Sequence, residues 1–237
     1  MAILSFFTKP ELPQYNESLL VDSPAALAQA LLVSDDIIKD ILSLASFVCN
    51  LPTHYQKGSG KLLKAENISS HIYKKLELLN KYLKSISYGT LSYTDGYAVE
   101  QLLQSIDELN QITDHLTHIA RVSKTLSRLK APLSFSAQKE LSELWSRIDI
   151  LLKTLEEAFL KSNSITSMWM LRQNSIIQEQ LKDLKKNHIA RLRSGKCNIE
   201  TGMCFLDLLY DYEQIASHCT ALFHEAFIMD TLEERKG

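Results

Sequence analysis

Long stretches without glycine or proline are the feature of this sequence that most limits its possible folds. The chain has seven glycines and five prolines among 237 residues, and after Pro132 neither residue recurs until Gly195. Hairpin turns between short strands and the loops that hold nucleotides both depend on these residues. We therefore expect long helices, and we exclude folds rich in hairpins or glycine loops.

Between the glycine and proline clusters, apolar residues recur every three or four positions, which is the period of a helix with one buried face. The pattern predicts six helices of about 25 to 35 residues. Ser23 is the expected cap of the first helix, and Asn198 is the expected cap of the sixth. A polar turn is expected at 161–167. The apolar periods run through 24–48, 68–86, 94–129, 141–159, 171–192 and 198–227.

A weak internal repeat divides these helices into two sets of three. Residues 109–117 (LNQITDHLT) align with 212–220 (YEQIASHCT) at an offset of 103, and both segments lie in the third helix of their half. Identical pairs include His115 with His218 and Thr117 with Thr220. We predict an all-α fold of two tandem antiparallel three-helix bundles. The expected parts are an N-terminal linker (1–22), a first repeat (23–131) and a second repeat (132–237).

Charge and motif content exclude several functional classes. The net charge is −2 and is spread over both halves, so no nucleic-acid surface is expected. No apolar run reaches the length of a membrane span, and the opening MAILSFF lacks the features of a secretory signal, which predicts a soluble chain. The four cysteines lack zinc-ligand spacing and are expected to be reduced thiols. Without GxSxG, HExxH or a phosphate-binding glycine loop, we expect no catalysis.

Three segments carry a resemblance to a known family. Residues 107–120 (DELNQITDHLTHIA) resemble the signature helix of PhoU-like proteins. Residues 191–219 are similar to the last helical hairpin of the cytoplasmic C-terminal PhoU-like domain of bacterial Na/Pi cotransporter-family proteins, and residues 19–31 are similar to its entry segment. The resemblance covers about residues 19–230.

This resemblance implies a regulatory, non-catalytic module in phosphate transport and phosphate homeostasis. The implied partner is a membrane phosphate transporter, either upstream on the same chain or acting as a separate protein. The implied location is the cytoplasm, at the inner face of the membrane through that transporter. A homodimer is compatible with the resemblance, and no nucleic-acid partner is implied.

In the family, an E/D-x-x-x-D motif on the third helix of each bundle can help hold a metal cluster, since residues i and i+4 share a helix face. Here the motifs read Asn110 with Asp114 and Glu213 with Ser217. The matching second-helix positions are Ser69 and Ile177, and neither is acidic. We therefore expect no bound metal or other cofactor. The weak candidate ligands for a divalent or ferric ion are Asp107, Asp114, His118, Glu213 and His218.

Other interpretations stay open from the sequence alone. Asp107, Asp114 and His118 could form one site on a helix face or be its solvated flank. The repeated His115 and His218 favour packing at a bundle seam over metal binding, and Glu213 favours pairing with a base. A basic stretch at the end of the fifth helix could contact lipid or phosphate, or simply offset the helix dipole. It comprises Lys182, Lys185, Lys186, His188, Arg191, Arg193 and Lys196.

Two further functional classes remain as alternatives to regulation of phosphate transport. One is a metal-binding helical protein whose degenerate motifs still hold one ion. The other is an oligomerisation scaffold without a ligand.

Overall fold

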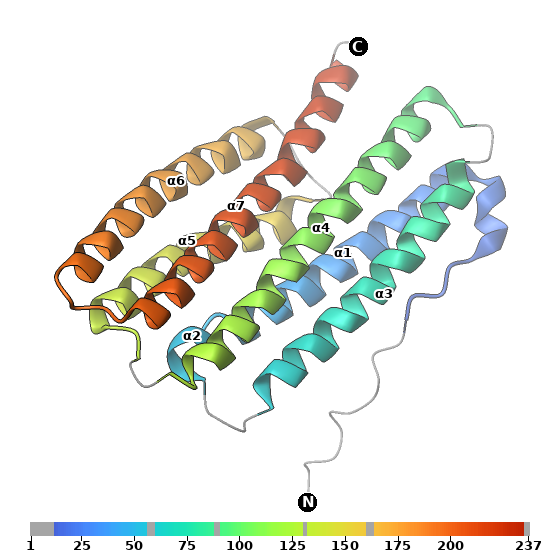
Figure 1. Cartoon of the computed structure of the whole chain (residues 1–237). Helices are drawn as coiled ribbons and strands as arrows, with labels where there is room; N and C mark the ends of the chain where they lie inside the picture. The colour runs from blue at the N-terminus through green and yellow to red at the C-terminus, as the bar shows by residue number, and fades with distance from the viewer. Residues whose placement is uncertain (1–11, 56–59, 88–90, 130–131, 160–163, 235–237) are drawn as a thin grey trace, which may run out of the picture.

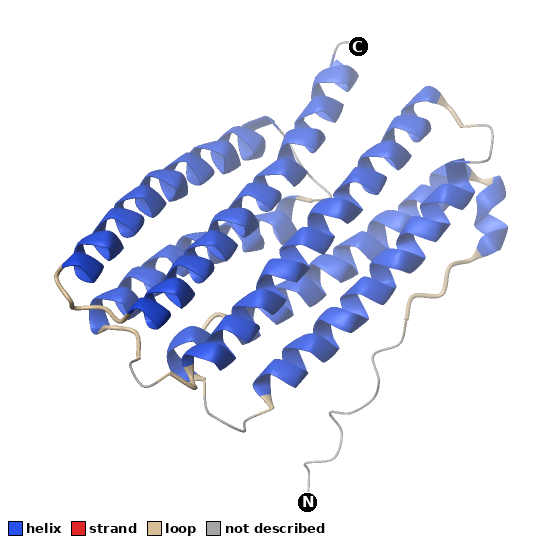
Figure 2. Ribbon diagram, viewed as in Figure 1, coloured by secondary structure: helices blue, strands red, loops and turns tan. Residues whose placement is uncertain are grey.

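The computed structural model describes residues 12–55, 60–87, 91–129, 132–159 and 164–234, with side chains of the last helix described as far as Phe223. Within these ranges the chain is helical and contains no strand (Figures 1 and 2). The elements are η1 (Glu17–Val21), α1 (Ser23–Val48), α2 (Leu51–His54), α3 (Lys61–Ser87), α4 (Tyr93–Leu126), α5 (Phe135–Ala158), α6 (Ser164–Arg193) and α7 (Ile199–Glu234).

Side-chain caps fix where several helices begin. Ser92 and Ser134 accept backbone N–H bonds at the starts of α4 and α5, and the Asn198 carboxamide accepts from Glu200 and Thr201, as expected for the sixth long helix. The expected cap Ser23 is wrong by one residue. Asp22 caps α1 instead, because its carboxylate accepts from the Ala25 N–H.

One other boundary differs from the sequence prediction, and α2 is a short helix that the sequence does not predict. α6 begins at Ser164, inside the turn expected at 161–167, while residues 160–163 lie outside the described ranges. The one-turn helix α2 follows Asn50 and carries Pro52 in its first turn, a position where proline's missing N–H is not needed.

α6 ends where Gly195 adopts a φ of 67°, a left-handed conformation that glycine takes without steric cost.

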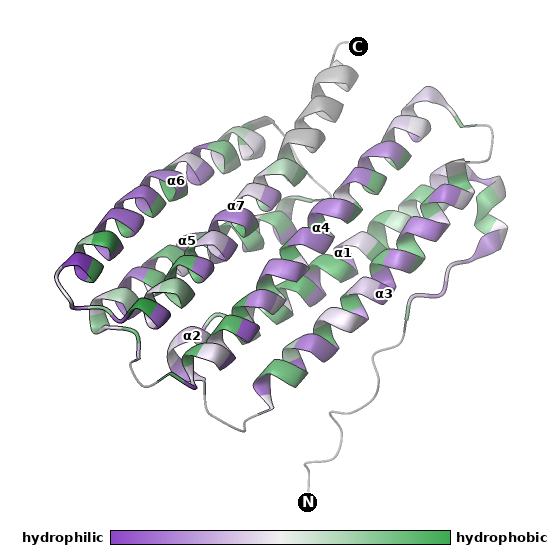
Figure 3. Cartoon of the chain, in the orientation of Figure 1, coloured by the Kyte–Doolittle hydropathy of each residue, from purple (hydrophilic) through white to green (hydrophobic). Residues whose placement is uncertain are grey.

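The helices pack as two adjoining three-helix bundles, as predicted. α1, α3 and α4 pack on one another, and so do α5, α6 and α7. The two sets meet mainly where α4 lies beside α7, with a smaller contact between α1 and α5 (Figure 1). Apolar residues line the faces between helices, while polar residues gather on the outer faces (Figure 3). Across the described residues, no helix is both long and apolar enough to cross a membrane.

Candidate functional site

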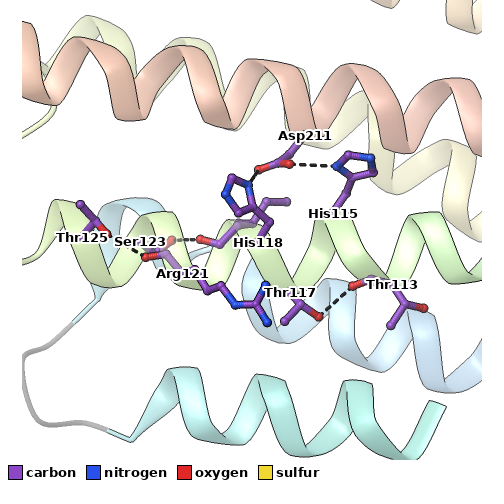
Figure 4. A network of polar contacts seen from close by, with 9 residues as sticks. Thr113, His115, Thr117, His118, Arg121, Ser123, Thr125 and Asp211 are labelled. Carbon is purple, nitrogen blue, oxygen red and sulfur yellow. Dashed lines mark hydrogen bonds and ion pairs between the residues drawn. The ribbon is translucent and has the colours of Figure 1, made fainter. Parts of the chain in front are cut away.

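The seam between α4 and α7 brings the two repeated segments face to face. Equivalent positions of the repeat have equivalent burial: Ile112 and Ile215 are fully buried, and Thr117 and Thr220 are nearly so. Each of these threonines donates its hydroxyl to a backbone carbonyl one turn earlier, of Thr113 and Ala216 respectively. The repeat therefore places equivalent residues at equivalent depth in the two third helices, and Thr117 faces Ser69 of α3 (Figure 4).

A buried carboxylate of α7 binds two histidines of α4 (Figure 4). Asp211 is 1% exposed. Its two oxygens lie 2.9 Å from His115 Nδ1 and 2.8 Å from His118 Nδ1. Because a buried carboxylate needs hydrogen-bond donors, this geometry favours a proton on Nδ1 of both rings.

A second acid–histidine pair crosses the seam with the roles of the two helices exchanged. Glu108 of α4 lies 2.6 Å from His218 Nδ1 of α7. With the offset of 103, Glu108 corresponds to Asp211 and His115 corresponds to His218. The two His rings stack, with centroids 5.8 Å apart. The carboxylate of each half thus binds the histidine of the other, as in a contact with twofold symmetry.

The symmetry is incomplete at one position. The residue that corresponds to His118 is Ala221, so Glu108 has one imidazole partner where Asp211 has two. Exposure differs accordingly: the side chains of Glu108 and His218 are 25% and 21% exposed, against 1% for Asp211. Asp211 is consequently the more deeply desolvated end of the seam.

The structure distributes the candidate metal ligands over different partners. The Tyr73 hydroxyl donates to Asp114, and Lys185 Nζ lies 2.8 Å from Glu213, which is the pairing with a base considered above. His118 and His218 both lie in the seam but bind different carboxylates, and Asp107 is exposed.

Within the part of the chain that is described, no group of three or more His, Cys, Asp or Glu residues is arranged to hold a metal ion. The matching second-helix residues offer no acid: Ser69 is buried 2.5 Å from the Thr117 hydroxyl, and Ile177 is fully buried. The absence of bound metal stays a prediction, which metal analysis of the purified protein tests.

Sequence reasoning missed Glu108 and Asp211 as site residues. The signal was present, because extending the aligned repeat by one residue before Leu109 pairs these two acids. An acid seven residues before a histidine lies two turns away on the same helix face. The aligned repeat alone, however, does not state that the two copies touch.

Burial controls the protonation of several groups outside the seam. It lowers the pKa of His188 and His71, with cationic Arg191 and Lys75 respectively as further causes, so both rings favour the neutral form. Burial also raises the pKa of the Cys204 and Cys219 thiols. These thiols lack the lowered pKa of a nucleophilic cysteine, and all four cysteines are free of disulfides.

Comparisons with known proteins find the same architecture. The chain is 20% identical over 194 residues to the phosphate-specific transport system accessory protein PhoU homolog 1 of Thermotoga maritima, covering 82% of both proteins. The crystal structure of the phosphate transport system regulatory protein PhoU from Streptococcus pneumoniae superposes with a TM-score of 0.79 at 16% identity, over 89% of this chain and 97% of that one.

PhoU from Pseudomonas aeruginosa gives a TM-score of 0.72 at 14% identity, over 91% and 98% of the two chains. No family model matches the sequence. The chain therefore has the PhoU fold over nearly its whole described length.

Proposed function

We propose that this chain is a non-catalytic regulatory module that controls phosphate uptake through a membrane phosphate transporter. The observation that carries the proposal is that the chain covers 97% and 98% of two PhoU structures with little left over. Two of these relatives, one an accessory protein and one a regulatory protein of phosphate transport systems, point to the same role.

A regulatory role agrees with the chemistry of the described side chains. The histidines of the seam are bound to carboxylates, and the buried Cys219 thiol keeps its proton. Neither arrangement supplies an activated nucleophile beside a base, which covalent catalysis needs. What the seam does supply is a polar contact that holds two helical units together.

The finer proposal concerns the transporter. The similarity of residues 191–219 to the last hairpin of Na/Pi cotransporter C-terminal domains favours a partner of that type, on the same chain or on a separate one. It also favours a position at the cytoplasmic face of the membrane. A homodimer is compatible with this position and is tested by the mass of the purified protein in solution.

The decisive experiment removes the coding region in the native host and measures uptake of radiolabelled phosphate in phosphate-poor and phosphate-rich medium. We expect uptake to stay high in rich medium, because the protein that restrains the transporter is missing, and a restored wild-type copy should reverse this. Equal uptake in the deleted and restored strains in both media would contradict the regulatory role. Co-purification of the tagged chain with a Na/Pi cotransporter-type protein tests the finer proposal.

A further inference from the structure

The structure divides the basic stretch of α6 into paired and unpaired residues. Lys185 binds Glu213, and Arg191 binds Glu140 through two guanidinium nitrogens at 2.8 Å each. His188 is only 2% exposed. Four exposed cations remain that form no ion pair with any residue the structure describes: Lys182, Lys186 and Arg193 on α6, and Lys196 just beyond its end.

The helix dipole does not account for this row of cations. The dipole acts on charges within the last turn. α6 ends at Arg193, whereas Lys186 and Lys182 lie about two and three turns earlier. Ile189, which is 49% exposed, lies between Lys186 and Arg193 in sequence, and it lines one open depression on the surface of α6 together with Lys182, Lys186 and Arg193.

A stripe of exposed apolar side chains runs along the neighbouring helix. Ile199, Met203 and Leu206 are 74%, 63% and 40% exposed and lie at i, i+4 and i+7 on α7. Single exposed apolar residues are ordinary, but a stripe along a helix face marks an interaction surface.

The cations and the stripe lie on the solvent-facing sides of two neighbouring helices. α6 and α7 are neighbours (Figure 1), and the His188 ring of α6 packs inward against Gly202 and Phe205 of α7. With about 100° per residue, Lys186 and Met203 then lie on the outward side of their helices. We call this surface the cationic–apolar face, formed by Lys182, Lys186, Arg193, Ile199, Met203 and Leu206.

The nearby acids of α7 lie to one side of this face. Asp211 points to α4, whereas Asp207 and Glu200 are exposed and lie on the side of α7 between Asp211 and Met203. Positive charge and apolar surface are therefore presented together, with Asp207 and Glu200 along the edge nearer α4 and with Glu213 already paired with Lys185. Lipid headgroups with negative charge attract such cations, while apolar side chains enter the boundary beneath the headgroups.

We propose that the cationic–apolar face docks directly on an anionic lipid surface. Two parallel rows, one cationic and one apolar, suit a flat partner that offers phosphate groups above hydrocarbon. This contact is separate from the proposed control of a transporter, and either one can fail without the other.

Co-sedimentation of the full chain with vesicles tests the proposal. We expect binding to vesicles of phosphatidylcholine mixed with phosphatidylglycerol, little binding to phosphatidylcholine alone, and weaker binding as salt rises, because salt screens the charges. The variant Lys182→Glu/Lys186→Glu/Arg193→Glu should bind at least about tenfold more weakly. The variant Ile199→Ser/Met203→Ser should also bind more weakly, by loss of apolar contact.

The matched control reverses three exposed cations elsewhere, in Lys74→Glu/Arg128→Glu/Arg147→Glu, and should bind like the wild type. Circular dichroism and thermal unfolding identify any variant that is misfolded, and only folded variants are compared. The proposal is overturned by absence of binding to the anionic vesicles, by equal binding to both vesicle types, or by an equal loss in the control. Absence of vesicle binding combined with binding to an acidic segment of a transporter would assign the face to a protein partner instead.

Discussion

At the scale of single residues, the cost of burying charge explains the arrangement around Asp211. A carboxylate that is 1% exposed loses most of its hydration and needs donors in exchange. His115 and His118 supply these donors from another helix, at 2.8 to 2.9 Å. Removing one side of such a contact costs more than the contact contributes, because it leaves the other side unpaired.

The first prediction concerns this carboxylate. Asp211→Ala should lower the free energy of unfolding by about 1 to 3 kcal/mol, because the largely buried His115 N–H and the half-exposed His118 N–H lose their acceptor. Chemical denaturation followed by circular dichroism measures the change.

Two other acids serve as controls for Asp211→Ala. Glu108→Ala, at the equivalent but more exposed position, should cost less than Asp211→Ala, and Asp207→Ala on the exposed side of the same helix should change stability by less than about 0.5 kcal/mol. Equal effects at positions 211 and 207 would show that burial of Asp211 is not what matters.

A second prediction follows from the neutral His188. Burial lowers its pKa in the folded protein, so near and below the ordinary histidine value of about 6.5 the unfolded chain binds more protons. Stability from this residue is therefore present at higher pH and is lost as the pH falls below that value. The unfolding free energy of the wild type should fall more steeply between about pH 7 and pH 5 than that of His188→Gln. Parallel curves for the two proteins would refute this assignment.

At the scale of elements, the distance between α6 and α7 depends on a residue without a side chain. A Cβ at Gly202 would lie 2.9 Å from His188 Cε1 and 3.3 Å from Leu192 Cδ2. Both contacts are shorter than carbon atoms normally allow, and the His188 ring also packs on Phe205, with the ring centroids 5.1 Å apart.

We therefore predict that Gly202→Ala destabilises the protein by about 1 to 3 kcal/mol, through overpacking between α6 and α7. Thermal and urea unfolding measure the loss. The matched control is Gly96→Ala in the first turns of α4, where the nearest atom is 4.0 Å away. That change should be neutral or stabilise by up to about 1 kcal/mol, since alanine favours helix. A stabilised Gly202→Ala would mean that the two helices separate without cost.

Sequence predicted the helices well because the determinants of a helix are local. The apolar period and the glycine and proline clusters identified the six long helices, and Asn198 was identified as a cap from its own chemistry. The start of α1 was wrong by one residue because Asp22 and Ser23 are both good caps. Only the hydrogen bond from the Ala25 N–H distinguishes them.

At the scale of the whole molecule, the sequence predicts the histidines of the α4–α7 seam but not their acidic partners. His115 and His218 were marked by their recurrence in the repeat, but their partners lie 96 and 110 residues away in sequence. Pairing over such distances depends on which helix faces meet, and a single amphipathic pattern does not specify this. The basic stretch shows the same limit, because the ion pairs that divide it come from α5 and α7.

The exchange of bonds across the α4–α7 seam has an evolutionary consequence. A contact in which each partner gives an acid and receives a histidine is self-complementary, so it would serve two identical chains as well as two halves of one chain. Fusion into one chain keeps the two halves at a high effective concentration, so the sequence of one half can change while the halves stay associated. The difference between His118 and Ala221 is of this kind, because two identical chains could not differ at equivalent positions.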